Sequence, residues 1–250
     1  MGVDIWEQPG YDVRLEWGAE GIENLGPGCT ALVIVDVLSF STTTDIVLGR
    51  GSRVLPLRWR DEQGVARARA AGADLAGEGA RTLRPSTVTE IPSDTLLALP
   101  SPNGATLCDK ASTAGAAVLV GCLRNAYAVA ERAHELSRGG PIGVIAAGER
   151  WGVSLFGDND GELGPLRPCV EDQLGAGAIV AALTAYDRVP SPEAALAATA
   201  YGGTDVLRAL HACTSGREHG AAGHEVNITL AAQVDVSMVA PVLSEGILSS

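Results

Sequence analysis

The stretch ALVIVDVL, residues 31–38, is a near-continuous run of aliphatic and β-branched residues. Such a run is typical of a central strand that helices cover on both faces. One carboxylate, Asp36, interrupts it close to its end. The polar residues Ser41 to Thr44 follow, and they can cap a helix that continues through Leu48. This stretch therefore predicts a buried strand, a polar turn and a helix.

The same order repeats along most of the chain. Further strands are predicted at residues 11–17, 53–57, 95–99, 116–123, 141–147 and 236–243, and further helices at about 61–71, 105–111, 125–136, 169–186, 192–200 and 205–213. Strands that alternate with helices predict an α/β fold with a mostly parallel sheet and helices on both faces. No low-complexity linker or internal repeat divides the chain. We therefore expect a single domain over residues 1–250.

Charge and hydropathy exclude some classes of partner. The chain has a formal net charge of −12, which opposes binding to the phosphate backbone of nucleic acid. No apolar run approaches the roughly 18 to 20 residues that a membrane helix needs. The N-terminal sequence MGVDIWEQPG lacks the basic and apolar regions of a secretory signal. We expect a cytoplasmic protein without nucleic-acid or membrane partners.

Several common catalytic centres are also disfavoured. The five cysteines are widely spaced and form no CxxC pair, so a zinc site or a disulfide framework is not expected. The chain has no GxSxG or Walker motif, which argues against a serine hydrolase and a P-loop enzyme. The acidic loop at residues 158–162 departs from the EF-hand spacing and is interpreted as a solvated turn.

Polar or glycine-rich turns follow four of the predicted strands. They lie at residues 36–44, 101–104, 121–125 and 147–149. In an open α/β sheet, ligands bind outside the carboxyl ends of the strands, so these turns are expected at one edge. Turns that lead into helices also offer free N–H groups and the positive end of a helix dipole. The sequence therefore predicts an anion site at this edge.

Three carboxylates are candidates for chemistry. Asp36 lies within an apolar strand, where a carboxylate needs a partner or a metal. The alternative is that Asp36 caps a neighbouring loop or pairs with an arginine. Glu171 and Asp172 are adjacent at the start of a predicted helix, where they either serve the helix dipole or bind a hard cation such as Mg²⁺.

Six segments, in this order, resemble the 2-phosphosulfolactate phosphatase family of coenzyme M biosynthesis. They are VIVDVLSFSTTT from Val33, SPNGATLC from Ser101, VLVGCLRNAYAVAERA from Val118, VIAAGE from Val144, VEDQLGAGAIVAAL from Val170 and SGREHGAAGHEVNITLAAQVDVSMVAPVL from Ser215. Together they run from about residue 31 to the C-terminus. The resemblance implies an Mg²⁺-dependent enzyme that hydrolyses a phosphate ester of a small sulfonated hydroxy acid.

The resemblance also implies positions for the site. The matching residues are Asp36, Asn103, Gly104, Asn125, Glu149, Glu171, Asp172, Gly216, Arg217 and Asp235. The chain departs from the family pattern at two positions. Ser39 lies where the family usually has arginine, and Asn227 lies where it usually has aspartate. The first departure removes an expected anion-binding group, and the second affects metal binding or proton transfer.

The expected function is hydrolysis of a phosphate monoester on a small acidic metabolite. Asp36, Glu149, Glu171 and Asp172 are the expected Mg²⁺ ligands, with Asp36, Glu171 and Asp172 as the catalytic set. Substrate contacts are expected from Ser41, Thr42, Thr43, Asn103, Gly104, Asn125 and one cation, Arg124 or Arg217. The alternatives are a non-catalytic protein that binds an acidic metabolite and, more weakly, an isomerase or lyase. Assembly into a homo-oligomer is left open.

Overall fold

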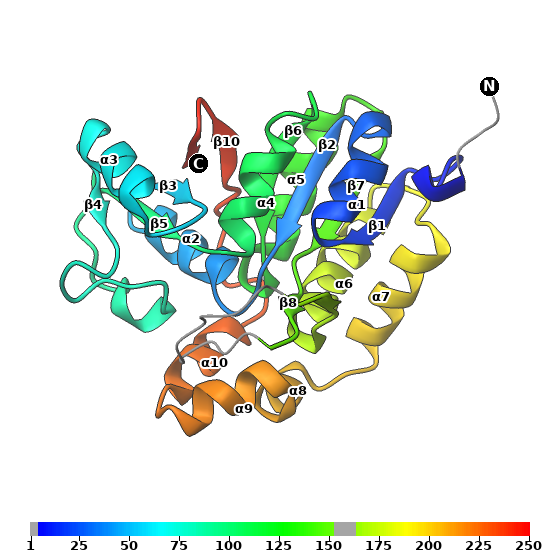
Figure 1. Cartoon of the computed structure of the whole chain (residues 1–250). Helices are drawn as coiled ribbons and strands as arrows, with labels where there is room; N and C mark the ends of the chain where they lie inside the picture. Colours follow the sequence, from blue (N-terminus) through cyan, green and yellow to red (C-terminus); the bar gives the residue numbers. More distant parts are fainter. Residues whose placement is uncertain (1–4, 153–163) are drawn as a thin grey trace.

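A nine-stranded sheet forms the centre of the computed structural model, which describes residues 5–152 and 164–250 (Figure 1). The strand order is β1-β7-β2-β6-β10-β11-β3-β5-β4. A separate two-stranded ribbon pairs β8 (Glu149–Arg150) with β9 (Leu166–Arg167). Helices cover both faces of the large sheet, so the predicted α/β fold with a mostly parallel sheet is confirmed. The domain boundaries at residues 1 and 250 stay a prediction, and the acidic loop at 158–162 lies outside the described residues.

One block of the sheet is entirely parallel. It contains β1 (Val13–Trp17), β7 (Ile142–Ala146), β2 (Ala31–Val35) and β6 (Ala117–Gly121). The strand β2 lies between β7 and β6, and all of its residues are buried. Its central position explains why its sequence is apolar at every residue, because both of its faces pack against helices.

The second parallel block is joined to the first by a hairpin. It contains β3 (Arg53–Leu57), β5 (Leu96–Pro100) and β4 (Asp74–Leu75). The antiparallel hairpin of β10 (Val242–Ser244) and β11 (Ile247–Ser249) lies between the blocks. It pairs with β6 through Val242 and Leu119, and with β3 through Leu248 and Val54.

The prediction of a closing strand at 236–243 was wrong in extent. Residues 236–241 have no regular structure, and β10 begins only at Val242. Apolar residues in this segment suggested a strand, but hydrogen bonds from the Asn125 side chain to the Val239 carbonyl and from the Ser237 N–H to the Arg124 carbonyl hold it as an irregular strap. The return strand β11 is only three residues long, so no pattern marked it.

Successive residues of β2 pack alternately into two separate hydrophobic cores, one on each face of the sheet. Val33 and Val35 pack in a cluster with residues of α5 (Ala126–Ser137) and α6 (Val170–Thr184). Leu32 and Ile34 pack on the other face with residues of α1, α2 and α4. Those helices span Gly18–Leu25, Phe40–Gly49 and Gly104–Ala111. The helix α1 was not predicted, because its sequence GAEGIENL contains two glycines and few apolar residues.

The remaining helices complete the layers. The helix α3 (Glu62–Ala70) covers the outer block, and α7 (Pro192–Gly202) packs beside α6. Three short helices, α8 (Val206–Ala212), α9 (Thr214–Ala221) and α10 (Glu225–Ala231), lie together below the sheet in Figure 1, beyond the carboxyl end of β2. Of these, only α8 was predicted. Among the described residues, no helix is both long enough and apolar enough to cross a membrane.

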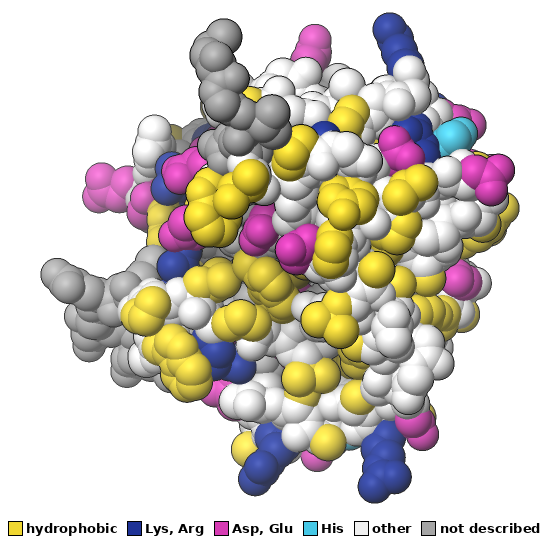
Figure 2. Space-filling model, turned by 90° about the vertical axis from the view of Figure 1, so that its right-hand side faces the viewer, with side chains coloured by type: hydrophobic (Ala, Val, Ile, Leu, Met, Phe, Trp, Pro, Cys, Tyr) yellow, Lys and Arg dark blue, Asp and Glu magenta, His cyan; other side chains and the backbone are white. Residues whose placement is uncertain are grey.

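The side of the molecule that carries α7 has hydrophobic side chains lying between acidic ones (Figure 2). Val189 and Leu196 are among the exposed hydrophobic residues, with 53% and 67% of their surface accessible. Exposed hydrophobic residues of this kind are normal on protein surfaces and identify no partner. Assembly into a homo-oligomer therefore stays a prediction.

Candidate active site

Asp36 directly follows β2 and caps two helices at once. Its Oδ1 accepts the N–H of Phe40 at 3.2 Å, and its Oδ2 accepts the N–H of Gly104 at 2.8 Å. Phe40 and Gly104 are the first residues of α2 and α4. The Ser101 hydroxyl also donates to Oδ2, at 3.4 Å. A carboxylate is favourable at the positive end of a helix dipole, and this one serves two such ends.

Gly104 can only be glycine in this arrangement. A Cβ atom built on it would lie 2.4 Å from a ring carbon of Phe40 and 2.8 Å from Oδ2 of Asp36. The close approach of α4 to Asp36 therefore depends on the missing side chain. This explains in physical terms why an Asn-Gly turn follows β5.

Glu149 lies on the same pocket as Asp36. Its Oε2 accepts a hydrogen bond of 2.9 Å from the Asn103 side chain, next to the start of α4. The pocket has a volume of about 260 Å³, and Asp36, Ser39, Asn103 and Glu149 are among the residues that line it. The ends of three strands, β2, β5 and β7, therefore meet here, whereas the fourth turn that the sequence placed at this edge, residues 121–125, does not line the pocket.

Burial makes these carboxylates unusual acids. Burial, opposed by hydrogen bonds from Gly104 and Phe40, raises the pKa of Asp36 to about 6, and the negative charge of Glu171 adds to the increase. Burial and the charge of Asp36 raise the pKa of Glu149 to about 7. Perturbed pKa values of this kind cluster at functional sites because catalysis needs groups that exchange protons near neutral pH.

Asp172 holds two of the strand-end turns together. Its Oδ1 accepts the N–H of Val37 and its Oδ2 accepts the N–H of Gly148, each at 2.8 Å. Val37 lies just beyond β2, and Gly148 lies just beyond β7. The burial of Asp172 and the charges of Glu171 and Asp36 raise its pKa. Because both oxygens accept N–H groups, we assign Asp172 a positioning role.

Glu171 is buried beside Asp172 at the start of α6. The Cys213 thiol is in hydrogen-bond contact with it, and burial followed by the charge of Glu171 raises the pKa of Cys213 to about 12. Neither Glu171 nor Asp172 is among the residues that line the pocket. The four predicted carboxylates thus form two pairs, one on the pocket and one behind it.

The model of the 2-phosphosulpholactate phosphatase family matches residues 22–246. The chain belongs to this family. The match runs from α1 into the turn of the final hairpin, so it includes every site residue that the sequence predicted. No curated protein matches the chain. The family resemblance of the six sequence segments is thereby confirmed.

The side chains of Ser41, Thr42 and Thr43, where a phosphate cradle was expected, form hydrogen bonds with other parts of the protein. The Ser41 hydroxyl accepts the N–H of Asp36 at 2.9 Å, and Thr42 and Thr43 donate to backbone carbonyls at 2.7 and 2.6 Å. The N–H groups of Ser41 and Thr43 donate to the carbonyls of Asp36 and Ser39. The expected phosphate cradle at these residues therefore needs correction, because their polar groups build the turn that carries Asp36.

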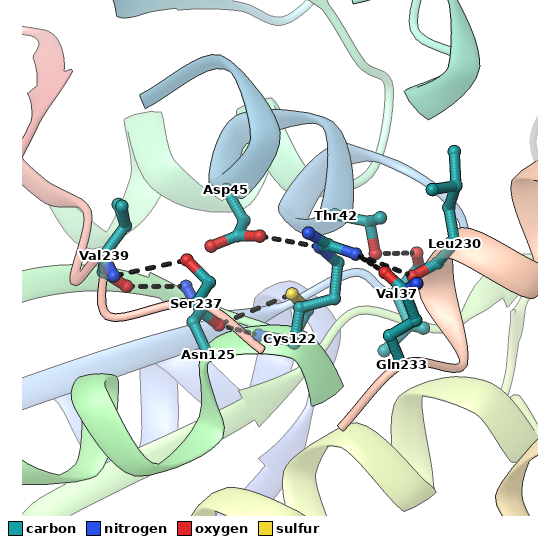
Figure 3. A network of polar contacts seen from close by, with 10 residues as sticks. Val37, Thr42, Asp45, Cys122, Asn125, Leu230, Gln233, Ser237 and Val239 are labelled. Atoms are coloured by element: carbon teal, nitrogen blue, oxygen red, sulfur yellow. Dashed lines mark hydrogen bonds and ion pairs between the residues drawn. The ribbon is translucent and has the colours of Figure 1, made fainter. Parts of the chain in front are cut away.

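Neither Arg124 nor Asn125 is among the residues that line the pocket. Figure 3 shows Asn125 in a network of polar contacts with Cys122 and Val239. The Arg124 Nε donates to Asp45 at 2.8 Å, and its Nη1 contacts Leu230 and Gln233. Asn125 accepts the N–H of Cys122 and donates to the carbonyl of Val239. These bonds hold the strap at 236–241, so the geometry gives no support to a role of either residue in substrate binding.

Arg217, the other expected cation, is exposed on α9 and is not among the residues that line the pocket. Arg58 and Arg150 line it instead, together with Trp59. Both arginines were overlooked in the sequence. The available signal was their place, since Arg58 directly follows β3 and Arg150 directly follows Glu149.

The two departures from the family pattern have different surroundings. Ser39 is buried and lines the pocket, so the substitution bears directly on the ligand. Asn227 lies in α10, where its Oδ1 accepts the N–H of Ser86 at 2.9 Å and its Nδ2 donates to the carbonyl of His224. An amide satisfies both contacts, whereas a carboxylate would face the carbonyl. Asn227 therefore fits its structural place.

Two carboxylates of the pocket are the candidates for binding a cation. Asp36 and Glu149 both line it. Within the described residues, no three acidic, histidine or cysteine side chains gather around a common point. Mg²⁺ is usually bound through one or two carboxylates and keeps several waters. The expected Mg²⁺ site therefore stays a prediction.

Proposed function

We propose that this protein hydrolyses a phosphate monoester of a small acidic metabolite in the pocket lined by Asp36, Asn103 and Glu149. One observation carries the proposal. A chain of the 2-phosphosulpholactate phosphatase family places two buried carboxylates with raised pKa values on one pocket of about 260 Å³. A cavity of this volume suits a small metabolite.

Each residue of the pocket has a distinct part. Asn103 orients Glu149 through its amide, and α4 begins directly beneath Asp36. Glu149, held on the pocket by Asn103, would accept a proton from the attacking water. The water oxygen forms a new P–O bond as the P–O bond to the metabolite breaks, and the leaving oxygen takes up the proton from Glu149 and departs as an alcohol. Positioning and charge stabilisation contribute most to phosphoryl transfer.

We also propose that Asp36, with Glu149 beside it, holds Mg²⁺. The bound ion would neutralise negative charge on the phosphoryl group. Hydrogen bonds from Gly104, Phe40 and Ser101 fix the Asp36 carboxylate and leave part of its acceptor capacity unused. Asp172 would act indirectly, by holding the turns after β2 and β7 in place. Asp172 and Glu171 would also act through their negative charge.

A screen of small phosphate monoesters, with Mg²⁺ and with EDTA, tests the proposal. We expect phosphate release that needs the metal, and a melting temperature that rises with Mg²⁺ because the ion binds the native state. Asp36→Asn and Glu149→Gln should lose activity, and Asp36→Asn should lose the thermal shift. Glu90→Gln, a control whose side chain is 90% exposed, should retain both. No release from any ester with Mg²⁺ or Mn²⁺ would contradict phosphatase activity.

The second candidate is a non-catalytic protein that binds an acidic metabolite. Ser39 favours it, because this residue lines the pocket where the family pattern has an arginine. Such a protein would bind the phosphate esters of the screen without releasing phosphate. Calorimetry on the same esters therefore separates the two candidates.

A further inference from the structure

Two arginines of the pocket have no firm structural partner. The guanidinium of Arg58 lies 3.8 Å from Asp109, and that of Arg150 lies 4.0 Å from Glu20. Both distances exceed that of a hydrogen bond, and neither guanidinium donates one to another described residue. Among the described residues, therefore, no hydrogen bond uses the donors of either guanidinium.

Other arginines of the chain show the contrast. The buried Arg188 donates to His134, Ser137 and two backbone carbonyls at 2.6 to 3.2 Å. Arg124 is held by Asp45 in the same manner. An arginine that stabilises the fold is thus recognisable by its bonds, and Arg58 and Arg150 make no such bonds to the part of the chain that the structure describes.

The two arginines reach one pocket from separate parts of the sheet. Arg58 follows β3 in the outer block, whereas Arg150 lies in β8, after β7 of the inner block. Apolar residues, among them Leu38, Leu83 and Leu107, line the same pocket. A ligand in this space therefore meets carboxylates, two guanidinium groups and an apolar wall. In a chain of net charge −12, such cations are needed to admit a ligand with several negative charges.

We propose that Arg58 and Arg150 determine specificity by binding a second anionic group of the phosphate ester, a carboxylate or a sulfonate. This inference rests on the proposed function, because it assigns the phosphoryl group to Asp36, Asn103 and Glu149. A guanidinium matches the planar, paired oxygens of a carboxylate through two parallel hydrogen bonds. Arg150 contributes more than Arg58, since 27% of its side chain is exposed against 57% for Arg58.

A matched pair of substrates tests the assignment. 2-Phosphoglycerate and glycerol 2-phosphate share a carbon skeleton and differ by one carboxylate. We expect Arg150→Gln to raise KM for 2-phosphoglycerate roughly tenfold, and Arg58→Gln by less, while kcat stays similar. KM for glycerol 2-phosphate should hardly change in either variant. Arg53→Gln is the control, because Arg53 is exposed at the opposite end of β3.

The outcomes separate this inference from the proposed function. The proposed function fails only if no ester of the wider screen is hydrolysed, and in that case calorimetry of 2-phosphoglycerate with wild type and Arg150→Gln still measures the anion contact. An equal loss for both esters would overturn the inference, because the arginines would then act on the phosphoryl group. Wild-type protein that binds the two esters equally well would overturn it too.

Discussion

A single carboxylate at the end of β2 organises the centre of the site. Asp36 accepts the first N–H groups of α2 and α4, so its charge is stabilised by two helix ends while its pKa still rises to about 6. Burial therefore outweighs the hydrogen bonds. The interpretation of Asp36 as a capping residue agrees with these bonds, and Asp36 also lines the pocket. Its metal binding stays a proposal.

Glu149 should make the stability of the metal-free protein depend on pH. Its folded pKa of about 7 exceeds the ordinary value of 4.5, so between these values the native state binds more protons than the unfolded state. Stability then falls as pH rises through this window. Glu149→Gln removes the effect. We expect the variant to gain on the order of 1 to 3 kcal/mol over wild type at pH 8, and little at pH 4.5.

Urea unfolding in EDTA at pH 4.5, 6 and 8 measures this difference. Glu90→Gln is the matched control, because its side chain is 90% exposed and its removal should change stability by the same small amount at each pH. A stability difference between Glu149→Gln and wild type that is constant across pH would show that the buried charge is not the cause.

At the scale of elements, helices and strands with a strong pattern of apolar and polar residues were predicted from the sequence, and those with a weak pattern were missed. The strand β2 and helix α2 were predicted because an apolar run is followed by a polar segment, although Asp36 rather than Ser41 to Thr44 caps the helix. The helices α9 and α10 were missed, since their sequences TSGREHGA and EVNITLA are short and the first carries few apolar residues. Contacts with distant parts stabilise them, such as the bond from Ser86 to Asn227. Such contacts are invisible in a local pattern.

The site shows the same division. The rule that ligands bind at strand ends brought Asp36, Asn103 and Glu149 together correctly. It could not show that Arg124 is held by Asp45, 79 positions earlier in the chain, or that Asp172 bonds to the turns after β2 and β7. Whether a polar group forms a hydrogen bond with a residue far away in the chain is decided by the tertiary structure. Sequence position alone therefore overestimates the number of groups available to a ligand.

The start of α4 provides an element-scale prediction. Gly104→Ala would place a Cβ 2.4 Å from the Phe40 ring and 2.8 Å from Asp36, so α4 must move away from the carboxylate. We expect a loss of about 1 to 3 kcal/mol of stability, typical of overpacking, and a large loss of activity. Thermal unfolding and phosphate release measure the two effects.

Gly202→Ala is the matched control for this change. Gly202 also lies in a helix, α7, but a Cβ there would meet no atom within 4 Å. Alanine should therefore stabilise the helix by roughly 0.5 to 1 kcal/mol and leave activity unchanged. If Gly104→Ala behaved like this control, the close packing of α4 on Asp36 would not be needed for the site.

At the scale of the whole molecule, the C-terminal hairpin joins two parallel blocks whose strands do not pair with each other directly. Its two strands contact the blocks through Val242 with Leu119 and Leu248 with Val54. Leu248 is fully buried in the core that also contains residues of α2 and α4. The pocket takes residues from both blocks, so its shape depends on this junction.

Leu248→Ala should therefore weaken the whole sheet. Truncation of a buried leucine costs about 2 to 5 kcal/mol, depending on how well the cavity collapses. Leu196→Ala, at a side chain that is 67% exposed, should change stability by less than about 0.5 kcal/mol.

The measurement is urea unfolding followed by far-UV circular dichroism and by tryptophan fluorescence. Trp17 lies at the end of β1 in the inner block, and Trp59 lies just beyond β3 of the outer block. Coincident transitions that shift together would show that the hairpin makes the blocks one cooperative unit. Leu248→Ala with wild-type stability would show that the two blocks hold together without it.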